Sequence, residues 1–354
     1  KTIKNTKQRN RISLTKIIYY SVEEVRLTKK HLKIKNISFG TAALGNNMFP
    51  NKQATEVINK AFEMGINYFD TAPLYGFGLG EHRLGSNLQL RDRVSYTLST
   101  KVGRLLSPVK PEDIDRETLK GGLHFNPYYD YSYDGTMRGI EQSMHRLGIT
   151  KIDILHIHDV DSFTHKEKNL VEKYFKEAIN GTYKALEELR RTNFISAIGV
   201  GVNEHEMAER FLNEADIDCV MLAGRYTLLE QKSLTTFLPL CEKKKVDVIL
   251  AAPFNSGILA GKDSNLNWNY ARASEEIINK VNDIKKVCSN YNVPLGAAAI
   301  QFPLAHSVIK TVVTGAISVK ELVENINYLD LKIPNELWQE LKKLNLIAEE
   351  VPVP

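Results

Sequence analysis

The chain has 354 residues, of which 43% are hydrophobic and 25% are charged, and its formal net charge is +5. These proportions are typical of a globular protein and exclude global disorder and fibrous repeats, and the length suffices for one large barrel or two ordinary domains. The longest apolar runs, such as Val246–Pro253, are too short to span a bilayer, and the three distant cysteines predict neither a disulfide framework nor a metal site.

The positive charge is concentrated at the start of the chain. The first 36 residues hold eleven Lys or Arg and two acids, a net charge of +9. Because the whole chain has a net charge of +5, the remaining residues carry a net charge of about −4. The basic character therefore belongs to a leader, and we expect no nucleic-acid binding by the folded body. We interpret residues 1–25 as a loosely ordered basic extension, with an organelle transit peptide as the alternative, and residues 26–354 as a single domain. We expect a cytoplasmic protein.

From residue 37 onward, short apolar runs alternate with amphipathic segments. Runs that are almost continuously apolar predict strands covered on both faces, as in parallel sheets. Eight such units without a linker predict an α/β fold of the closed (β/α)₈ type, the TIM barrel. An open doubly wound sheet is the alternative, and the absence of a GxGxxG motif after the first run disfavours it. The eight predicted strands are Ile37–Thr41, Asn67–Ala72, Tyr96–Val102, Ile152–His158, Phe194–Val200, Cys219–Leu222, Val246–Ala252 and Ile309–Val313.

The segments between these runs carry helical apolar stripes. One stripe consists of Val57, Ile58, Ala61 and Phe62. A second runs from Met137 to Leu147, and Gly148 is expected to end that helix. A third begins after Asn203, which is a possible helix cap.

Two longer connections, residues 103–133 and 257–273, follow the third and seventh strands and are rich in aromatic residues. We expect these loops to cover the carboxyl-terminal mouth of the barrel, where Phe125, Tyr128 and Trp268 are candidate substrate contacts.

Ionisable residues lie at the carboxyl ends of three consecutive predicted strands: Asp70, Lys101 and His158, with Tyr75 five residues after the first. In a barrel these ends converge on one mouth, where active sites lie. A lysine ammonium lowers the pKa of a neighbouring tyrosine, and an aspartate keeps such a lysine charged. A histidine can orient an oxygen of the substrate. The set is therefore suited to moving one proton. His156, two residues before His158, is interpreted as a buried, hydrogen-bonded core residue.

Several segments resemble the aldo-keto reductase superfamily, among them GINYFDTAPLYGFGLGEHRLG, LSTKVGRLL, SMHRLGITKIDILHIHD and VTGAISVKELVEN. The similarity covers residues 26–330, and PFNSGILAG and VPLGAAAIQFPLAHSVIKTVVTGA are most like the sugar dehydrogenase branch. The resemblance implies a catalytic tetrad of Asp70, Tyr75, Lys101 and His158. It also implies a nicotinamide dinucleotide bound across the barrel top without a Rossmann motif. The implied cofactor-binding residues are Gly40, Thr41, Asn203, Arg225, Pro253, Asn255, Ser256, Gly257, Gly315, Ser318, Glu321, Glu324 and Asn325.

Departures from the family bear on the cofactor. NADP-preferring members carry Lys and Arg where this chain has Gly315 and Glu321, so NAD is the expected cofactor. Lys320 leaves NADP as the alternative. The usual holders of the nicotinamide are replaced by Gly201-Val202, Ala223 and Ala251, so Asn203 and Arg225 are expected to take over that role.

The resemblance implies that the protein oxidises the anomeric carbon of an aldose of the D-threo-aldose, L-fucose or L-galactose type to a lactone, with Tyr75 as acid and base. Oxidation of pyridoxal, general reduction of aldehydes by NADPH, and a non-catalytic redox-sensing subunit are the alternatives. The expected partner is a small sugar or aldehyde, and we expect a monomer or weak homo-oligomer that does not bind membranes.

Overall fold

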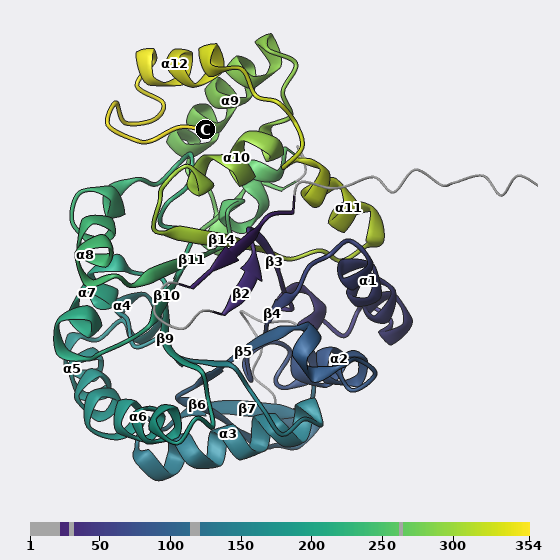
Figure 1. Ribbon diagram of the computed structural model, residues 1–354, viewed down its shortest axis with the longest axis vertical. Coiled ribbons are helices and arrows are strands. Elements are labelled where there is room, and N and C mark those ends of the chain that lie inside the picture. The colour runs from purple at the N-terminus through teal and green to yellow at the C-terminus, as the bar shows by residue number, and fades with distance from the viewer. Residues whose placement is uncertain (1–21, 28–31, 114–120, 262–264) are drawn as a thin grey trace, which may run out of the picture.

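The computed structural model describes residues 22–27, 32–113, 121–261 and 265–354 (Figure 1). Its centre is a closed barrel of eight parallel strands, in the circular order β3, β4, β5, β8, β9, β10, β11, β14. Each strand overlaps one of the eight predicted runs, so the (β/α)₈ barrel is confirmed and the open sheet is wrong. The bounds are β3 (Ile37–Gly40), β4 (Tyr68–Asp70), β5 (Thr97–Val102), β8 (Ile154–His158), β9 (Ala197–Val202), β10 (Cys219–Ala223), β11 (Asp247–Ala251) and β14 (Ile309–Thr314).

The amino-terminal end of the barrel is closed by an antiparallel hairpin of β1 (Glu24–Arg26) and β2 (Lys33–Lys35). Leu27 and Ile34 are buried in one apolar cluster with strand residues of the barrel such as Tyr68. The Asn67 amide donates to the Lys33 carbonyl at 3.1 Å, which ties the hairpin to the start of β4. Strand β1 thus includes residues before the expected boundary at residue 26, and residues 1–21 of the predicted extension lie outside the described residues.

Helices surround the barrel and bury their predicted stripes against it (Figure 1). Helix α3 begins at a Ser132 cap and ends at Gly148, whose φ of 63° is left-handed. The start of α7 differs from expectation: its cap is Glu204, because the side chain of Asn203 is bonded elsewhere. The helices are α1 (Asn51–Glu63), α2 (Leu79–Leu88), α3 (Tyr133–Leu147), α4 (Ser162–His165), α5 (Lys168–Glu177), α6 (Tyr183–Arg191), α7 (His205–Glu214), α8 (Phe237–Lys244), α9 (Glu275–Asn290), α10 (Leu295–Leu304), α11 (Val319–Asn327) and α12 (Asn335–Lys343).

Each of the two long connections contains a hairpin. The first pairs β6 (Arg104–Pro108) with β7 (Phe125–Tyr129), and the second pairs β12 (Asn267–Trp268) with β13 (Ala271–Arg272). Both follow the carboxyl ends of barrel strands, so they extend from the end of the barrel where the candidate residues lie.

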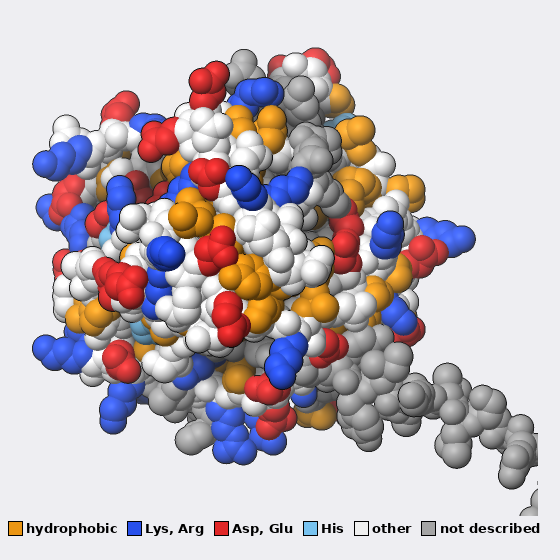
Figure 2. Space-filling view, turned by 90° about the horizontal axis from the view of Figure 1, so that it is seen from above, with side chains coloured by type: hydrophobic (Ala, Val, Ile, Leu, Met, Phe, Trp, Pro, Cys, Tyr) orange, Lys and Arg blue, Asp and Glu red, His pale blue; other side chains and the backbone are white. Residues whose placement is uncertain are grey.

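Three further features of the described part of the chain are its surface charge, its helix hydropathy and its cysteines. Acidic and basic side chains are interspersed on the face shown in Figure 2, without a broad patch of one sign. No helix within the described ranges is long and apolar enough to cross a membrane. The three cysteines, Cys219, Cys241 and Cys288, are buried.

Two glycines of the α2–α3 pair test the packing of this helix layer. A methyl group on Gly85 of α2 would lie 2.2 Å from the Leu147 carbonyl of α3, whereas one on Gly139 of α3 would meet only the Leu105 side chain at 3.8 Å. We expect Gly85→Ala to destabilise the fold by about 1–3 kcal/mol, because backbone must move to admit it. Gly139→Ala, the matched control, should be neutral or stabilise by up to about 1 kcal/mol. Urea denaturation of both variants measures the difference, and equal midpoints would contradict this packing.

Candidate active site

Four ionisable side chains meet at the carboxyl-terminal mouth of the barrel. The Lys101 ammonium lies 2.6 Å from a carboxylate oxygen of Asp70 and donates to the Thr71 carbonyl at 2.9 Å. The same nitrogen lies 4.8 Å from the centre of the Tyr75 ring. The rings of Tyr75 and His158 are perpendicular, with their centres 6.4 Å apart. The structure therefore brings together all four residues that the strand-end argument singled out.

The Lys101–Asp70 ion pair is almost fully buried, with side-chain exposures of 2% and 3%. Its carboxylate is held from the other side, because the Ser99 hydroxyl donates to the second Asp70 oxygen at 2.6 Å. Burial raises the pKa of Asp70, and Lys101 partly offsets that rise. A buried pair of this kind is stable only while both charges are present, since removing one leaves the other desolvated.

The protonation state of Tyr75 differs from the expectation. Its pKa is raised well above 10, first by burial and then by the carboxylates of Asp70 and Asp159, while Arg104 lowers it. The expectation that Lys101 brings this pKa towards neutrality is wrong here, because the ammonium is directed to Asp70 and Thr71 and desolvation outweighs the nearby positive charge. At neutral pH the phenol is protonated.

The two histidines of β8 are neutral. Burial and the charges of Lys101 and Arg104 lower the pKa of His158 well below its usual value. Burial likewise lowers the pKa of His156. Its core position agrees with the expectation, but neither ring nitrogen has a hydrogen-bond partner among the described residues. The predicted hydrogen bonding is thus wrong, and the cause is that the ring packs on Gly199, which has no side chain to offer.

Arg104 and Asp159 form a second buried ion pair at the mouth, which the sequence analysis missed. An Arg104 guanidinium nitrogen lies 2.5 Å from an Asp159 oxygen, and each side chain is about 10% exposed. The same oxygen lies 3.3 Å from Nε2 of His158. Burial raises the pKa of Asp159 to about 6. The rule that ionisable residues at the carboxyl ends of strands converge on the mouth (the strand-end rule) could have found both residues. Asp159 follows β8 directly, and Arg104 comes two residues after β5.

Several expected cofactor residues line the same end of the barrel. Gly40 ends β3, and the Thr41 hydroxyl after it donates to the Thr71 hydroxyl at 2.8 Å. The Asn325 amide donates to the Gly315 carbonyl at 3.3 Å. At the start of α11, the Ser318 hydroxyl accepts from the Glu321 amide and the Glu321 carboxylate accepts from the Ile317 amide at 3.0 Å. Glu324 is exposed and accepts from Tyr328.

The segment after β11 has an unusual backbone that suits close approach by a ligand. Asn255, Ser256 and Gly257 all have positive φ, at 44°, 62° and 100°. Buried Pro253 precedes them. Asn255 braces the loop, because its amide donates to the Gly224 carbonyl at 2.9 Å and its oxygen accepts from the Thr227 hydroxyl. The Asn255 amide donates to the Ala252 carbonyl at 3.0 Å and the Gly257 amide to the Phe254 carbonyl at 2.9 Å, so the loop is held in this shape by its own backbone.

The β12–β13 hairpin engages the two residues expected to hold a nicotinamide. The Tyr270 hydroxyl donates to Oδ1 of Asn203 at 3.3 Å, and Arg225 donates to Asn269 at 2.5 Å. The Ser256 hydroxyl accepts from the Tyr270 amide at 2.9 Å. Polar groups from the ends of β3, β9, β10, β11 and β14 thus surround one mouth, which fits a dinucleotide lying across it, with Asn203 and Arg225 bonded to the hairpin.

The three expected substrate residues are placed unequally. Phe125 pairs with Pro108 at the outer end of the β6–β7 hairpin, and Tyr128 pairs with Leu105, on the face opposite to Arg104. Trp268 is half-buried, and its indole nitrogen has no partner among the described residues. Nearer the tetrad lie Tyr129, whose ring centre is 4.9 Å from the Arg104 guanidinium, and Tyr131, whose hydroxyl donates to the His158 carbonyl at 2.6 Å.

This geometry can be set beside known proteins. The model of the aldo/keto reductase family matches residues 36–346. The chain belongs to the aldo/keto reductase family. It is 37% identical to a pyridoxal 4-dehydrogenase from Microbacterium luteolum, over 92% of this chain and 98% of that one. It is 36% identical to a D-threo-aldose 1-dehydrogenase from a Pseudomonas species, over 89% and 95%. A glycerol dehydrogenase from Gluconobacter oxydans shares the fold, with a TM-score of 0.72 at 21% identity, over 94% and 98%.

Membership in the family makes the protein an enzyme, an oxidoreductase that uses a nicotinamide cofactor, NAD(H) or NADP(H). When bound, the nicotinamide exchanges a hydride with the substrate. The described residues contain no group of three His, Cys, Asp or Glu side chains that could hold a metal ion.

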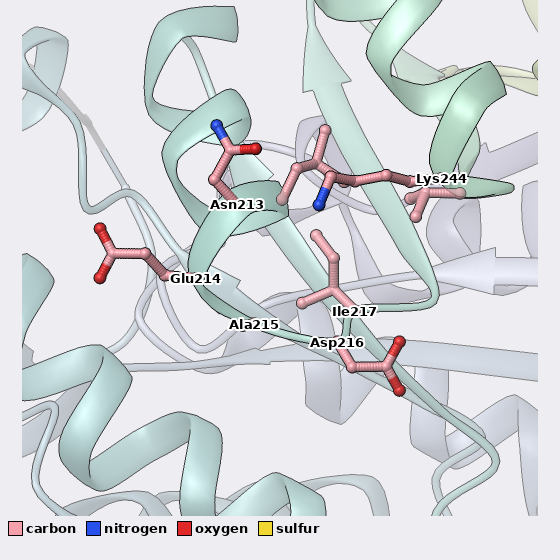
Figure 3. A pocket seen from close by; sticks show the side chains of 8 residues that line it. Asn213, Glu214, Ala215, Asp216, Ile217 and Lys244 are labelled. Atoms are coloured by element: carbon pink, nitrogen blue, oxygen red, sulfur yellow. The ribbon is translucent and has the colours of Figure 1, made fainter.

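A hollow of about 350 Å³ lies at the opposite end of the barrel, lined by the end of α7 and the residues before β10 and β11 (Figure 3). The carboxylates of Glu214 and Asp216 point in different directions there. The hollow lies apart from the mouth that holds the four ionisable side chains.

Removing Lys101 tests the buried ion pair. We expect Lys101→Met to destabilise the fold by about 3–5 kcal/mol at pH 7, because Asp70 is left charged and desolvated. In the unfolded chain the Asp70 carboxyl has a pKa near 3.9, and in the folded variant its pKa is higher. The loss of stability is therefore complete above both pKa values and shrinks as the pH falls through them, because protonation removes the buried charge. Chemical denaturation at pH 7 and pH 4.5, relative to the unmodified protein, measures this change. The double variant Asp70→Asn/Lys101→Met should be less sensitive to pH, and a single-variant deficit that is the same at both pH values would refute the pairing.

Proposed function

We propose that the protein is an NAD-dependent dehydrogenase that oxidises the anomeric carbon of a cyclic aldose to a lactone. The observation that carries the proposal is the buried cluster of Tyr75, Lys101, Asp70 and His158 at the barrel mouth. The identity with a D-threo-aldose 1-dehydrogenase, which extends over most of both chains, supports the same chemistry.

In this proposal each residue of the cluster has one task. The Tyr75 oxygen accepts the proton of the anomeric hydroxyl as the carbon–hydrogen bond at that centre breaks. Neutral His158 holds the same substrate oxygen by a hydrogen bond. Lys101, fixed by Asp70, supplies a positive charge beside the phenol and stabilises the phenolate form. In the reverse direction, the protonated phenol donates to the carbonyl oxygen.

The raised pKa of Tyr75 gives the two directions different pH dependence. Reduction uses the protonated phenol that is present at neutral pH, whereas oxidation uses the scarce phenolate. Oxidation therefore gains from alkaline conditions and from a positive charge nearby, such as that of Lys101.

A preference for NAD rests on the start of α11. Glu321 places its carboxylate at the start of that helix, where it accepts from the amide of Ile317, just before the Ser318 cap, at 3.0 Å. A ribose 2′-phosphate approaching this end of the helix would meet a like charge at close range, while the hydroxyl of NAD would not.

The substrate class can be tested with a panel of aldoses and pyridoxal, each incubated with NAD or NADP while the absorbance of the reduced cofactor is followed. Turnover of aldoses with NAD supports the proposal. Turnover of pyridoxal alone, the reaction in the name of the Microbacterium luteolum relative, would replace it.

Tyr75→Phe should lower turnover by about 10²–10⁴-fold, the usual contribution of a general acid or base. The unmodified enzyme should also oxidise faster as the pH rises, by about tenfold per pH unit until the phenol ionises, and the variant should lose this slope. Steady-state rates from pH 6 to pH 10, with cofactor dissociation constants as the control, measure both effects. A variant that binds cofactor and keeps the slope would rule out Tyr75 as the proton carrier.

Glu321→Arg should shift the ratio of NADP to NAD affinity towards NADP by about tenfold, since it replaces repulsion of the 2′-phosphate by a charged hydrogen bond. Glu321→Gln, which removes the charge without adding a cation, should fall between the two. Fluorescence titration of each protein with both cofactors gives the ratios. Unchanged ratios would place the 2′ position away from α11.

A further inference from the structure

We propose that the carboxylate of Asp159, held by Arg104, binds the hydroxyl group next to the carbon that is oxidised, so that the enzyme selects uncharged aldoses with a free 2-hydroxyl. This inference rests on the proposed function and specifies its substrate.

The first support is the position of the carboxylate. One oxygen of Asp159 lies 3.3 Å from Nε2 of His158, the side chain proposed to hold the reacting oxygen. Vicinal hydroxyl oxygens of a sugar ring are separated by about one hydrogen-bond length. A sugar whose first oxygen is held by His158 therefore brings its second hydroxyl to the neighbourhood of Asp159.

The second support is how firmly the carboxylate is fixed. Asp159 has a φ of 52°, and its amide donates to the Gly201 carbonyl at 2.9 Å. One carboxylate oxygen accepts from Arg104, and the other accepts from the Asn203 amide at 3.2 Å. A carboxylate offers about four acceptor sites, so these bonds leave capacity for a hydroxyl donor.

Arg104 is fixed as well. Its guanidinium lies over the Tyr129 ring, and the neighbouring Tyr131 hydroxyl binds the His158 carbonyl, which anchors the β6–β7 hairpin to the end of β8. The Nε atom of Arg104 has no hydrogen-bond partner among the described residues, and neither does Nδ1 of His158, although both atoms are buried. Buried polar groups without partners are costly, and a polar group of a ligand at the mouth would satisfy Nε of Arg104.

The charges of the mouth favour a neutral substrate. Lys101 and Arg104 provide two positive charges, and Asp70, Asp159 and the buried Asp161 provide three carboxylates. Asp161 accepts from the Asn203 backbone amide at 2.6 Å. Arg225 adds a third positive charge at this mouth, so with every acid ionised the set is neutral and gives an anionic sugar no net attraction, while hydroxyl groups can donate to the carboxylates.

The test compares L-fucose with 2-deoxy-L-fucose, and L-galactose with 2-deoxy-L-galactose, as substrates of the unmodified enzyme and of Asp159→Asn. The unmodified enzyme should have a kcat/KM at least about tenfold lower for each deoxy sugar, because the deoxy sugar leaves the buried carboxylate without its donor. In Asp159→Asn this preference should fall to within about threefold, since an amide oxygen is a weaker acceptor than a carboxylate.

Asp153→Asn is the matched control, because buried Asp153 forms an ion pair with partly exposed Arg93 just before the amino end of the same strand, β8. It should lower the thermal midpoint and leave the preference for the 2-hydroxyl unchanged.

The outcomes separate the two proposals. If the unmodified enzyme oxidises no aldose, the proposed function fails and this inference fails with it. If it oxidises aldoses with the same kcat/KM whether or not they carry a 2-hydroxyl, only this inference is overturned. That comparison uses the unmodified enzyme alone, so it does not depend on whether a variant folds. A preference that persists in folded Asp159→Asn would also overturn it.

Discussion

The buried ion pair of Lys101 and Asp70 is the constraint on which the mouth of this barrel depends. Two charges with almost no solvent exposure persist together only because each supplies the other's counter-charge and because Ser99 and the Thr71 carbonyl complete their hydrogen bonds. The pair fixes the ammonium beneath the Tyr75 ring. It also raises the cost of any rearrangement of β4 or β5 at their carboxyl ends, so the position of Tyr75 is set by electrostatics as well as by packing.

A second ion pair extends this arrangement across the mouth. Arg104 and Asp159 come from a hairpin and from the residue after β8, and they connect the side chains of His158 and Asn203. The two pairs flank the space between Tyr75 and His158 with fixed charges of both signs. Such preorganised dipoles and charges need not reorient during a reaction, which is the main advantage of an enzyme site over water. In the proposed function, the first long connection therefore contributes Arg104 to the charges around the mouth.

The sequence predicted most of the fold, because eight apolar runs of the right length and spacing have few other solutions than a barrel. It also located Asp70, Tyr75, Lys101 and His158, since the strand-end rule is geometric. The rule could not reveal the balance between desolvation and charge at Tyr75, which depends on burial and on carboxylates from other strands. For the same reason it missed the partnerless ring of His156, whose neighbour Gly199 is 43 residues away in the chain. The contacts of Asn203 and Arg225 with the β12–β13 hairpin were beyond its reach too, because they are set by tertiary structure.

The burial of all three thiols has a practical consequence for studying the β12–β13 hairpin. Burial raises the pKa of Cys288 to about 11, and the pKa of Cys241 is raised by burial as well. Maleimide reagents attack the thiolate, so the native cysteines are shielded from them both sterically and chemically. A single cysteine introduced at exposed Arg272 would then be the one readily labelled site of the whole chain. A fluorophore there would report directly on whether the hairpin shifts when a nucleotide enters.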